Sequence, residues 1–307
     1  MKKLSNEKFQ LAKKFIKEQA RPIDQALFSY VFEDENKEKV LEELKKFQNE
    51  DGGFGHAIEP DFRLQISSPM ATTVGLQYAR SVGATSREKI IEAAITYLLN
   101  SYNHQRQRWQ ALSKEVNEVP HAPWWSYNVE TDACGVEETW ANPSAEIVGY
   151  LHDHKSLVKE SFLEEVTSLA LEQLNHLPES IEMHDFLCYQ RLVDSLHGEA
   201  EKKVKTRLRG STRLTVTLNP AEWSGYSVRP LQIVHTPNSP FYDLLEHEVE
   251  LNLQFEIDTI GEDGAWRPNW SWFGQYEEEW KKAEVEWAGY LTVSKLITLK
   301  NFDRIEL

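Results

Sequence analysis

The chain has 307 residues, of which 40% are hydrophobic, and a formal net charge of −15. That length is enough for one large domain or two small ones with a sizeable buried core. The strong negative charge repels phosphate backbones, so it argues against general nucleic-acid binding. For the same reason we do not expect docking on an anionic membrane by charge alone.

The cysteines and the first residues bear on where the protein works. Cys134 and Cys188 are too few for a disulfide framework, so we interpret them as reduced thiols of a cytoplasmic protein. The start, MKKLSNEKF, is basic but lacks the apolar run of a signal peptide, and no stretch approaches 18 apolar residues. We therefore expect a cytoplasmic location and no integral membrane association, with the oligomeric state unknown.

Apolar residues at helical spacing dominate the chain. Ser67 or Ser68 is expected to cap a helix over residues 70–82, and Ser86 a helix over residues 90–101. Further helices are predicted over residues 4–19, 23–32, 37–48, 145–152, 157–177, 181–196, 202–213, 241–260 and 277–299.

Two segments depart from this helical pattern. The helical rhythm fades from Tyr102, and a long segment follows that contains His121-Ala122-Pro123-Trp124-Trp125. Loops of such length inside a compact domain are usually functional. Residues 214–218, LTVTL, alternate and are β-prone, and the wider stretch 213–235 is expected to be β-prone or irregular.

A turn phrase occurs twice. Residues 48–63 read QNEDGGFGHAIEPDFR, and Glu262 to Trp266 repeat the acidic glycine turn followed by an aromatic residue. Phe54, Trp109 and Trp266 lie 55 and 157 positions apart, which fits a repeat of about 50 residues. Two helices per repeat give five or six hairpins, which either close into a ring or form an open superhelix.

At residues 48–55 and 261–266 the chain resembles the QW repeats of terpenoid cyclases and protein prenyltransferases. In those families Gln stands at a helix end, and Gly-x-Trp in the next turn ties adjacent helix ends of an α/α toroid together. Gln48, Gly52 and Phe54 match with Phe in place of Trp; Gly264 and Trp266 match without the Gln. The resemblance implies an all-α protein built as an α/α toroid.

More narrowly, the chain resembles bacterial proteins described as prenyltransferase-like or squalene-cyclase-like. The phrases that carry this likeness are QNEDGGFGHAIEPDFR, HAPWW, ANPSAE and the Trp-rich end, and they extend over most of the chain. We accordingly predict one α/α-toroid domain over residues 1–307, with the helix of residues 4–19 packed on it. Toroids host unrelated chemistries, so the likeness says more about fold than about function.

The chain also departs from these families. It has neither the DxDD motif of class II cyclases nor a DDxxD motif for Mg-bound diphosphate. Asp132-Ala133-Cys134 has the Asp-x-Cys spacing of the prenyltransferase zinc site, but zinc usually needs three protein ligands. We expect no metal or cofactor, with zinc at Asp132 and Cys134 as a weak possibility.

The catalytic candidates lie on the loop after the first glycine turn. If it is desolvated, either Glu59 or Asp61 can act as an acid beside its ionised neighbour, with Arg63 holding the ionised one. His56 is the candidate proton shuttle. The alternative interpretation is structural: Asp61 caps a helix, and Glu59 pairs with Arg63 on the surface.

Aromatic residues in irregular segments are the candidate ligand contacts. Their faces can stabilise a carbocation by cation–π attraction or stack against a sugar ring, whereas helix-end packing is the structural alternative. Trp266 is expected to pack. The predicted substrate-binding set is Arg63, His121, Trp124, Trp125, Asn142, Tyr226, Arg229, Trp270 and Trp272.

The leading functional expectation is a terpenoid-cyclase-like or prenyltransferase-like enzyme that acts on a small apolar isoprenoid in an aromatic-lined central cavity. Asp61 or Glu59 would start the reaction as proton donor. Two alternatives are a carbohydrate-active α/α-toroid enzyme, such as a hydrolase or epimerase, and a non-catalytic small-molecule binding protein. A dry cavity favours the first, and a polar site with two carboxylates favours the carbohydrate alternative.

Overall fold

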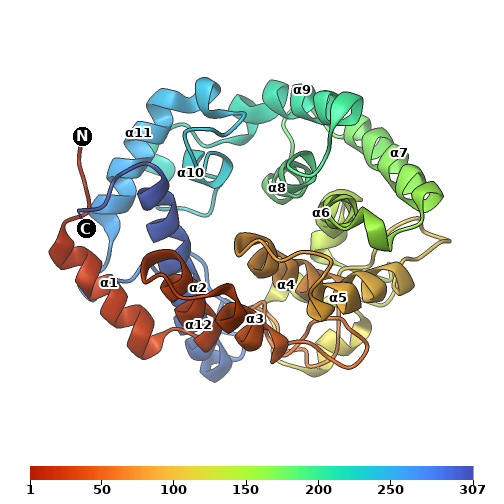
Figure 1. Ribbon diagram of the computed structural model, residues 1–307, viewed down its shortest axis with the longest axis horizontal. Helices are drawn as coiled ribbons and strands as arrows, with labels where there is room; N and C mark the ends of the chain where they lie inside the picture. The colour runs from red at the N-terminus through yellow and green to blue at the C-terminus, as the bar shows by residue number, and fades with distance from the viewer. Residues whose placement is uncertain (307) are drawn as a thin grey trace. The chain divides into compact units, whose positions relative to one another are not determined.

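A computed structural model describes residues 1–306 (Figure 1). Over these residues the chain is mostly helical, with one two-stranded sheet, which confirms the all-α expectation. The helices are α1 (Asn6–Gln19), α2 (Pro22–Phe32), α3 (Lys37–Lys45), α4 (Pro69–Ser81), α5 (Lys89–Asn100), α6 (Ala141–Asp153), α7 (Glu160–His176), α8 (Met183–Val193), α9 (Gly198–Thr215), α10 (Pro230–Ile233), α11 (Tyr242–Thr259) and α12 (Glu277–Asn301). The strands β1 (Tyr127–Asn128) and β2 (Ala133–Cys134) pair antiparallel.

The described chain divides into two compact units. Unit 1 comprises residues 1–35, 209–271 and 278–307; unit 2 comprises residues 36–208 and 272–277. The short segment Trp272–Glu277 therefore belongs to unit 2, although the chain on both sides of it belongs to unit 1. The expectation of a single domain over residues 1–307 stays a prediction. Within residues 1–306, no helix combines the length and apolar character that a membrane crossing requires.

The centre of unit 2 is the helix α6. Every residue from Ala141 to Leu151 is buried, and α6 packs against both α7 and α8. Gly149 allows the close approach to α8, because an added Cβ would stand 3.1 Å from the carbonyl oxygen of Arg191. In unit 1, α1 and α2 pack through Phe9, Phe28 and Phe32, whose ring centroids lie 5.0 to 6.2 Å apart.

The repeated turn phrase has the same backbone geometry in both units. In unit 2 the N–H of Asn49 donates to the carbonyl of Gly53 at 2.9 Å. In unit 1 the N–H of Gly261 donates to the carbonyl of Ala265, also at 2.9 Å. The similar phrases NEDGG and GEDGA therefore form one kind of turn, as the repeat interpretation expects.

The inner glycine of each turn is required by both conformation and space. Gly52 has φ of +91° and Gly264 has φ of +84°, a region that side-chain-bearing residues rarely adopt. A Cβ at Gly52 would stand 2.3 Å from the carbonyl oxygen of Ala93, and one at Gly264 2.3 Å from the nitrogen of Ala12. Each turn thus presses directly against the backbone of another helix.

The three aromatic markers share one environment. All are buried, and each one's backbone N–H donates to a hydroxyl from a later helix: Phe54 to Thr72 at 3.1 Å, Trp109 to Ser144 at 3.2 Å, and Trp266 to Thr292 at 3.1 Å. The expectation that Trp266 packs is confirmed, since its side chain is 3% exposed. These recurring contacts join each turn to a helix within the same unit.

Gln48 connects the first glycine turn to a neighbouring helix, as the resemblance to QW repeats implied. Its side-chain amide donates to the carbonyl of Gly52 at 2.9 Å and to that of Ile90 at 2.8 Å. The first bond closes the turn, and the second joins the turn to the first residues of α5. The turn in unit 1 has no such Gln; Ile260 immediately precedes Gly261 there.

One predicted helix cap is confirmed and another is wrong. Ser68 caps α4, because its hydroxyl accepts a hydrogen bond from the N–H of Ala71 at 3.1 Å. Ser86 does not cap α5: that helix begins after Glu88, without a side-chain cap. The Ser86 hydroxyl lies instead 3.0 Å from Nδ1 of His154, so a tertiary contact takes the place of the local one.

The β-prone interpretation of residues 214–218 is also wrong. Helix α9 extends through Thr215, and no strand forms between there and α10. The rest of the 213–235 stretch is irregular, as expected, apart from the short 3-10 turn Pro220–Glu222 and the single turn of α10. A five-residue alternation cannot outweigh the continuing helix when no partner strand is present.

The hydroxyl-to-turn contacts make a stability prediction. Replacing Thr72 or Thr292 by Val keeps the shape but leaves the N–H of Phe54 or Trp266 buried without an acceptor, which costs about 1–3 kcal/mol. Urea unfolding should show this loss for each variant. The control is Thr96→Val, because the exposed Thr96 hydroxyl bonds only the carbonyl of Glu92 in its own helix. Equal effects at Thr72 and Thr96 would contradict the assignment.

Candidate functional site

Two segments that the sequence singled out lie side by side in unit 2. The carbonyl of Asp61 accepts a hydrogen bond from the N–H of Ala122 at 2.7 Å, and the N–H of Arg63 donates to the carbonyl of Pro120 at 2.9 Å. The pairing is antiparallel, with Phe62 opposite His121. The loop of Glu59 and Asp61 is thereby joined to the HAPWW segment, as a shared site requires.

Both predicted acids are buried. Asp61 is 3% exposed and Glu59 is 7% exposed. Glu59 accepts a hydrogen bond from the N–H of Asp61 at 2.7 Å, and Asp61 Oδ1 accepts one from the indole N–H of Trp272 at 2.7 Å. Two parts of the structural alternative are wrong: Ser68 caps α4 in place of Asp61, and Glu59 does not lie on the surface. The pairing of Glu59 with Arg63 stays a prediction.

The aromatic side chains of the segment that begins at Trp272 differ widely in exposure. Trp272 is fully buried, whereas Phe273 is 76% exposed and Tyr276 is 45% exposed. Phe273 has φ of +51° and Tyr276 φ of +47°, values that are uncommon for bulky residues. Such backbone strain concentrates at functional sites, where the surrounding structure holds it in place.

We use the name aromatic platform for Trp124, Phe273 and Tyr276. The rings of Trp124 and Phe273 lie 6.5 Å apart at 87°, and the ring of Tyr276 lies 5.8 Å from that of His121 at 45°. Neither pair is stacked flat: the first is edge-to-face and the second is tilted. Two of the three platform rings, Phe273 and Tyr276, are exposed, and Trp124 is half-buried.

Trp125 is a packing residue with an unused donor. Its side chain is 5% exposed and meets Phe62 edge-on, with 5.1 Å between ring centroids. Its indole N–H is buried and has no hydrogen-bond acceptor among the described residues. A buried donor without an acceptor costs free energy, so this indole N–H is an unmet hydrogen bond of the fold.

The two histidines near the acid loop are held by neighbouring groups. His121 places Nδ1 2.7 Å from the carbonyl of Val119 and Nε2 3.1 Å from the hydroxyl of Ser126. His56 places Nδ1 2.8 Å from the side-chain oxygen of Gln65 and Nε2 2.8 Å from that of Asn49. The His56 ring therefore fastens the turn, and its role as proton shuttle stays a prediction.

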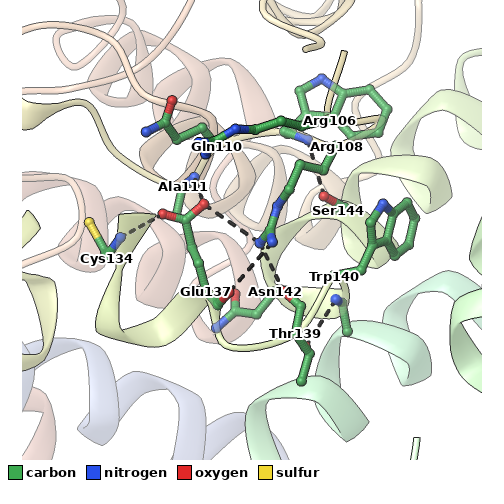
Figure 2. Close-up of polar contacts among 12 residues, drawn as sticks. Arg106, Arg108, Gln110, Ala111, Cys134, Glu137, Thr139, Trp140, Asn142 and Ser144 are labelled. Atoms are coloured by element: carbon green, nitrogen blue, oxygen red, sulfur yellow. Dashed lines mark hydrogen bonds and ion pairs between the residues drawn. The ribbon is translucent and has the colours of Figure 1, made fainter. Parts of the chain in front are cut away.

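A buried carboxylate anchors the long loop that carries the HAPWW segment (Figure 2). Glu137 accepts hydrogen bonds from the N–H of Ala111 at 3.0 Å and of Cys134 at 2.9 Å. Arg108 lies 3.6 Å from the same carboxylate and donates to the carbonyl of Thr139 at 2.8 Å. Both ends of the loop are thus gathered around one charge. Burial raises the pKa of Glu137, against the effect of these hydrogen bonds and of Arg108.

The geometry gives no support to zinc at the Asp-x-Cys sequence. Asp132 is engaged by the hydroxyl of Tyr127 and by Arg106, whose Nη2 lies 2.7 Å away. Burial, followed by the nearby Glu137 charge, raises the pKa of Cys134 to about 12, which disfavours the thiolate that binds metal. Among residues 1–306, no three His, Cys, Asp or Glu side chains form a group that would hold a metal ion.

Asn142 lies in a separate buried polar network between α6 and α8. It is 7% exposed, and its side-chain oxygen lies 3.7 Å from the thiol of Cys188. One turn further along α6, Glu146 is 3% exposed and satisfied by three side chains: Gln77 at 2.8 Å, Tyr150 at 2.6 Å and Arg191 at 3.0 Å. A ligand role for Asn142 stays a prediction.

The remaining predicted contacts belong to unit 1. Tyr226 is 56% exposed and meets Trp270 edge-on at 5.8 Å, while Arg229 pairs with Glu256 at 2.9 Å. The predicted set is therefore divided: Tyr226, Arg229 and Trp270 lie in unit 1, and the other members lie in unit 2.

Two surface clefts lie elsewhere in the described residues. One, of about 790 Å³, is in unit 1 and is lined mainly by α11 together with Arg213 and Arg304. The other, of about 380 Å³, lies between α7 and α9 in unit 2. Neither cleft is lined by a residue that the sequence predicted for the site.

Sequence reasoning missed three residues that shape the site. Phe273 and Tyr276 follow the Trp-rich stretch, and the accompanying Gly274 was the available signal for a left-handed turn. Glu137 stands among other acidic residues, so no local pattern distinguishes it as the buried one.

Comparisons with known proteins returned no match to any family model, curated protein or solved structure. The likeness to the terpenoid cyclases and prenyltransferases therefore remains an interpretation of the quoted motifs.

The buried network predicts a pH effect at Asp185 in α8. Asp185 is 4% exposed and accepts a hydrogen bond from Thr139 at 2.7 Å; burial raises its pKa from 3.8 to about 6. A raised carboxyl pKa stabilises the fold at low pH, and this contribution is lost as the pH rises from about 4 to about 6. Asp185→Asn keeps the acceptor and removes the charge.

We therefore expect Asp185→Asn to be more stable than the wild type by about 1–3 kcal/mol at pH 7.5, and nearly equal to it at pH 4. Urea unfolding of both proteins at the two pH values measures the difference. A variant that is less stable at pH 7.5 would show that the ionised Asp185 is favourable in the folded protein.

Proposed function

We propose that the aromatic platform binds a carbohydrate and that the protein is a carbohydrate-binding or carbohydrate-active member of the α/α-toroid type. The observation that carries this proposal is the exposure of Phe273 and Tyr276 on a strained turn that Trp272 fastens to the buried Asp61. The proposal draws on the second and third of the three functions that the sequence left open.

The arrangement of the rings suits a sugar. A pyranose ring presents an apolar face that stacks on an aromatic side chain and hydroxyls that need hydrogen-bond partners at the edge. Phe273 and Tyr276 offer the first, and the buried indole N–H of Trp125 is an unused donor in the same unit. Half-exposed aromatic rings accompanied by a few polar groups are typical of such sites.

The isoprenoid expectation fits this geometry less well. Acid-initiated cyclisation needs a carboxylic acid that carries its proton. The carboxylate of Asp61 is instead engaged by the fold, since Oδ1 accepts the indole N–H of Trp272. Glu59 likewise accepts the N–H of Asp61. Both carboxylates are placed to hold the site together, so we assign them a positioning role for the platform.

The α/α toroid is part of the same proposal. Helices pair as neighbours in both units, and the same glycine turn with its buried aromatic residue occurs in each. Repeats that bury one face against their neighbours favour a ring or a superhelix. Small-angle X-ray scattering distinguishes a compact closed particle, which we expect, from an elongated one.

The binding test compares a soluble β-glucan oligosaccharide, a uronic-acid oligosaccharide and geranylgeranyl diphosphate by isothermal titration calorimetry. We expect one of the two oligosaccharides to bind and the isoprenoid not to. The double variant Phe273→Ala/Tyr276→Ala should bind about tenfold more weakly, because each lost aromatic contact is worth about 0.5–1.5 kcal/mol. Folding is checked by circular dichroism.

The matched control is Val129→Ala. Val129 is 72% exposed and lies in the same unit, so the change removes exposed apolar surface without touching the platform. Its affinity should equal that of the wild type. Binding of the isoprenoid alone, or carbohydrate binding that the double variant retains in full, would contradict the proposal.

A further inference from the structure

A charged cluster lies in unit 1, and none of its residues belongs to the aromatic platform. Its centre is Glu256 on α11, whose side chain is 6% exposed. Arg229, which precedes α10, places Nη1 2.9 Å from Oε1 of Glu256. Lys295 on α12 places Nζ 2.5 Å from Oε2. Three segments distant in the sequence thus bring two cations to one carboxylate.

The carboxylate already has partners at both oxygens. Besides Arg229, Oε1 of Glu256 lies 3.3 Å from the side-chain amide of Asn252, one turn earlier on α11. Asn252 is itself fixed, because its oxygen accepts the N–H of Leu231 at 3.0 Å. Glu256 is therefore held in place with its acceptors occupied, and one negative charge faces two positive ones.

Each cation also lies over an aromatic ring. Lys295 Nζ is 5.6 Å from the ring centroid of Trp266, and the Arg229 guanidinium is 5.5 Å from that of Phe255. These rings hold the cations in position without neutralising them. A guanidinium has five N–H donors and an ammonium has three, so a single carboxylate uses only part of the capacity of the pair.

The two cations are mostly buried, which strengthens their electrostatic interactions, but part of each side chain is exposed to solvent. The side chains of Arg229 and Lys295 are 16% and 20% exposed. Charges in such surroundings are screened less than surface charges. Burial lowers the pKa of Lys295, and the Arg229 charge lowers it further, against the pull of Glu256. An additional anion would relieve this cost.

We propose that Arg229 and Lys295 form a binding site for a small organic monocarboxylate, with Glu256 and Asn252 as positioning residues. One added negative charge balances the excess of one positive charge in the cluster, whereas a doubly charged phosphate would exceed it. The rings of Phe255 and Trp266 fix the two cations from the protein side, so that their remaining donors can meet the carboxylate of the ligand. This proposal does not rest on the carbohydrate proposal, and the two sites share no residue.

The probe is benzoate, with benzamide as its neutral counterpart, titrated at low salt and followed by protein-observed NMR. We expect saturable benzoate binding, at least tenfold tighter than any binding of benzamide. Saturation by an anion is informative here because the chain carries a net charge of −15 and repels anions in general. Equal binding of benzoate and benzamide, or no saturable binding of benzoate, overturns the proposal.

Two variants locate the site. Lys295→Met removes the charge and keeps the length, and it should weaken benzoate binding at least tenfold; Lys295→Arg should restore most of it. The control is Lys282→Met on the same helix, where the exposed Lys282 pairs only with Glu279. Unchanged affinity in a folded Lys295→Met variant overturns the proposal.

If Lys295→Met fails to fold, the wild-type protein provides the test. Reductive ¹³C-methylation labels the lysines, and the resonance lost in Lys295→Arg identifies Lys295. Bound benzoate should raise the pKa of Lys295, since a nearby negative charge favours the ammonium form. A pKa of Lys295 that benzoate does not move overturns the proposal, because the anion would then be bound elsewhere.

Discussion

The hydrogen bond from the indole of Trp272 to the carboxylate of Asp61 joins positions 211 residues apart within unit 2. A buried carboxylate is costly unless donors reach it, so this bond is part of what makes the burial of Asp61 tolerable. It also fixes the start of a six-residue segment whose flanking chain belongs to unit 1. Phe273 and Tyr276, which are exposed, follow this buried anchor within the same segment.

A second kind of contact recurs in the helical framework of both units. A glycine turn approaches a neighbouring backbone, an aromatic residue fills the space after it, and a hydroxyl from a later helix accepts that residue's N–H. Each hydrogen bond contributes little by itself, but each satisfies a buried backbone N–H that lies outside the helices. The long loop follows the same logic, with Glu137 supplying acceptors where regular structure is absent.

Much of this framework could be predicted from the sequence, and the reasons are physical. Helices follow from apolar spacing over ten or more residues, and the turn phrases follow from paired glycines, so these local signals sufficed. The sequence predicted that Asp61, Glu59 and the HAPWW segment contribute to one site, but it did not predict the backbone pairing that joins them. The sequence could not show that Tyr226, Arg229 and Trp270 belong to a different unit from Trp272, because that depends on contacts between distant segments. Lys295 was missed because a lysine within a helix is usually exposed.

A double-mutant cycle between Asp61 and Trp272 tests the account most directly. Asp61→Ala, Trp272→Phe and the combined variant would be unfolded in urea, and the coupling energy taken from the four free energies. A charge-assisted hydrogen bond at a buried site predicts a coupling of about 1.5–3 kcal/mol. A coupling below about 0.5 kcal/mol would mean that the two side chains act independently, and the platform would then owe its position to something else.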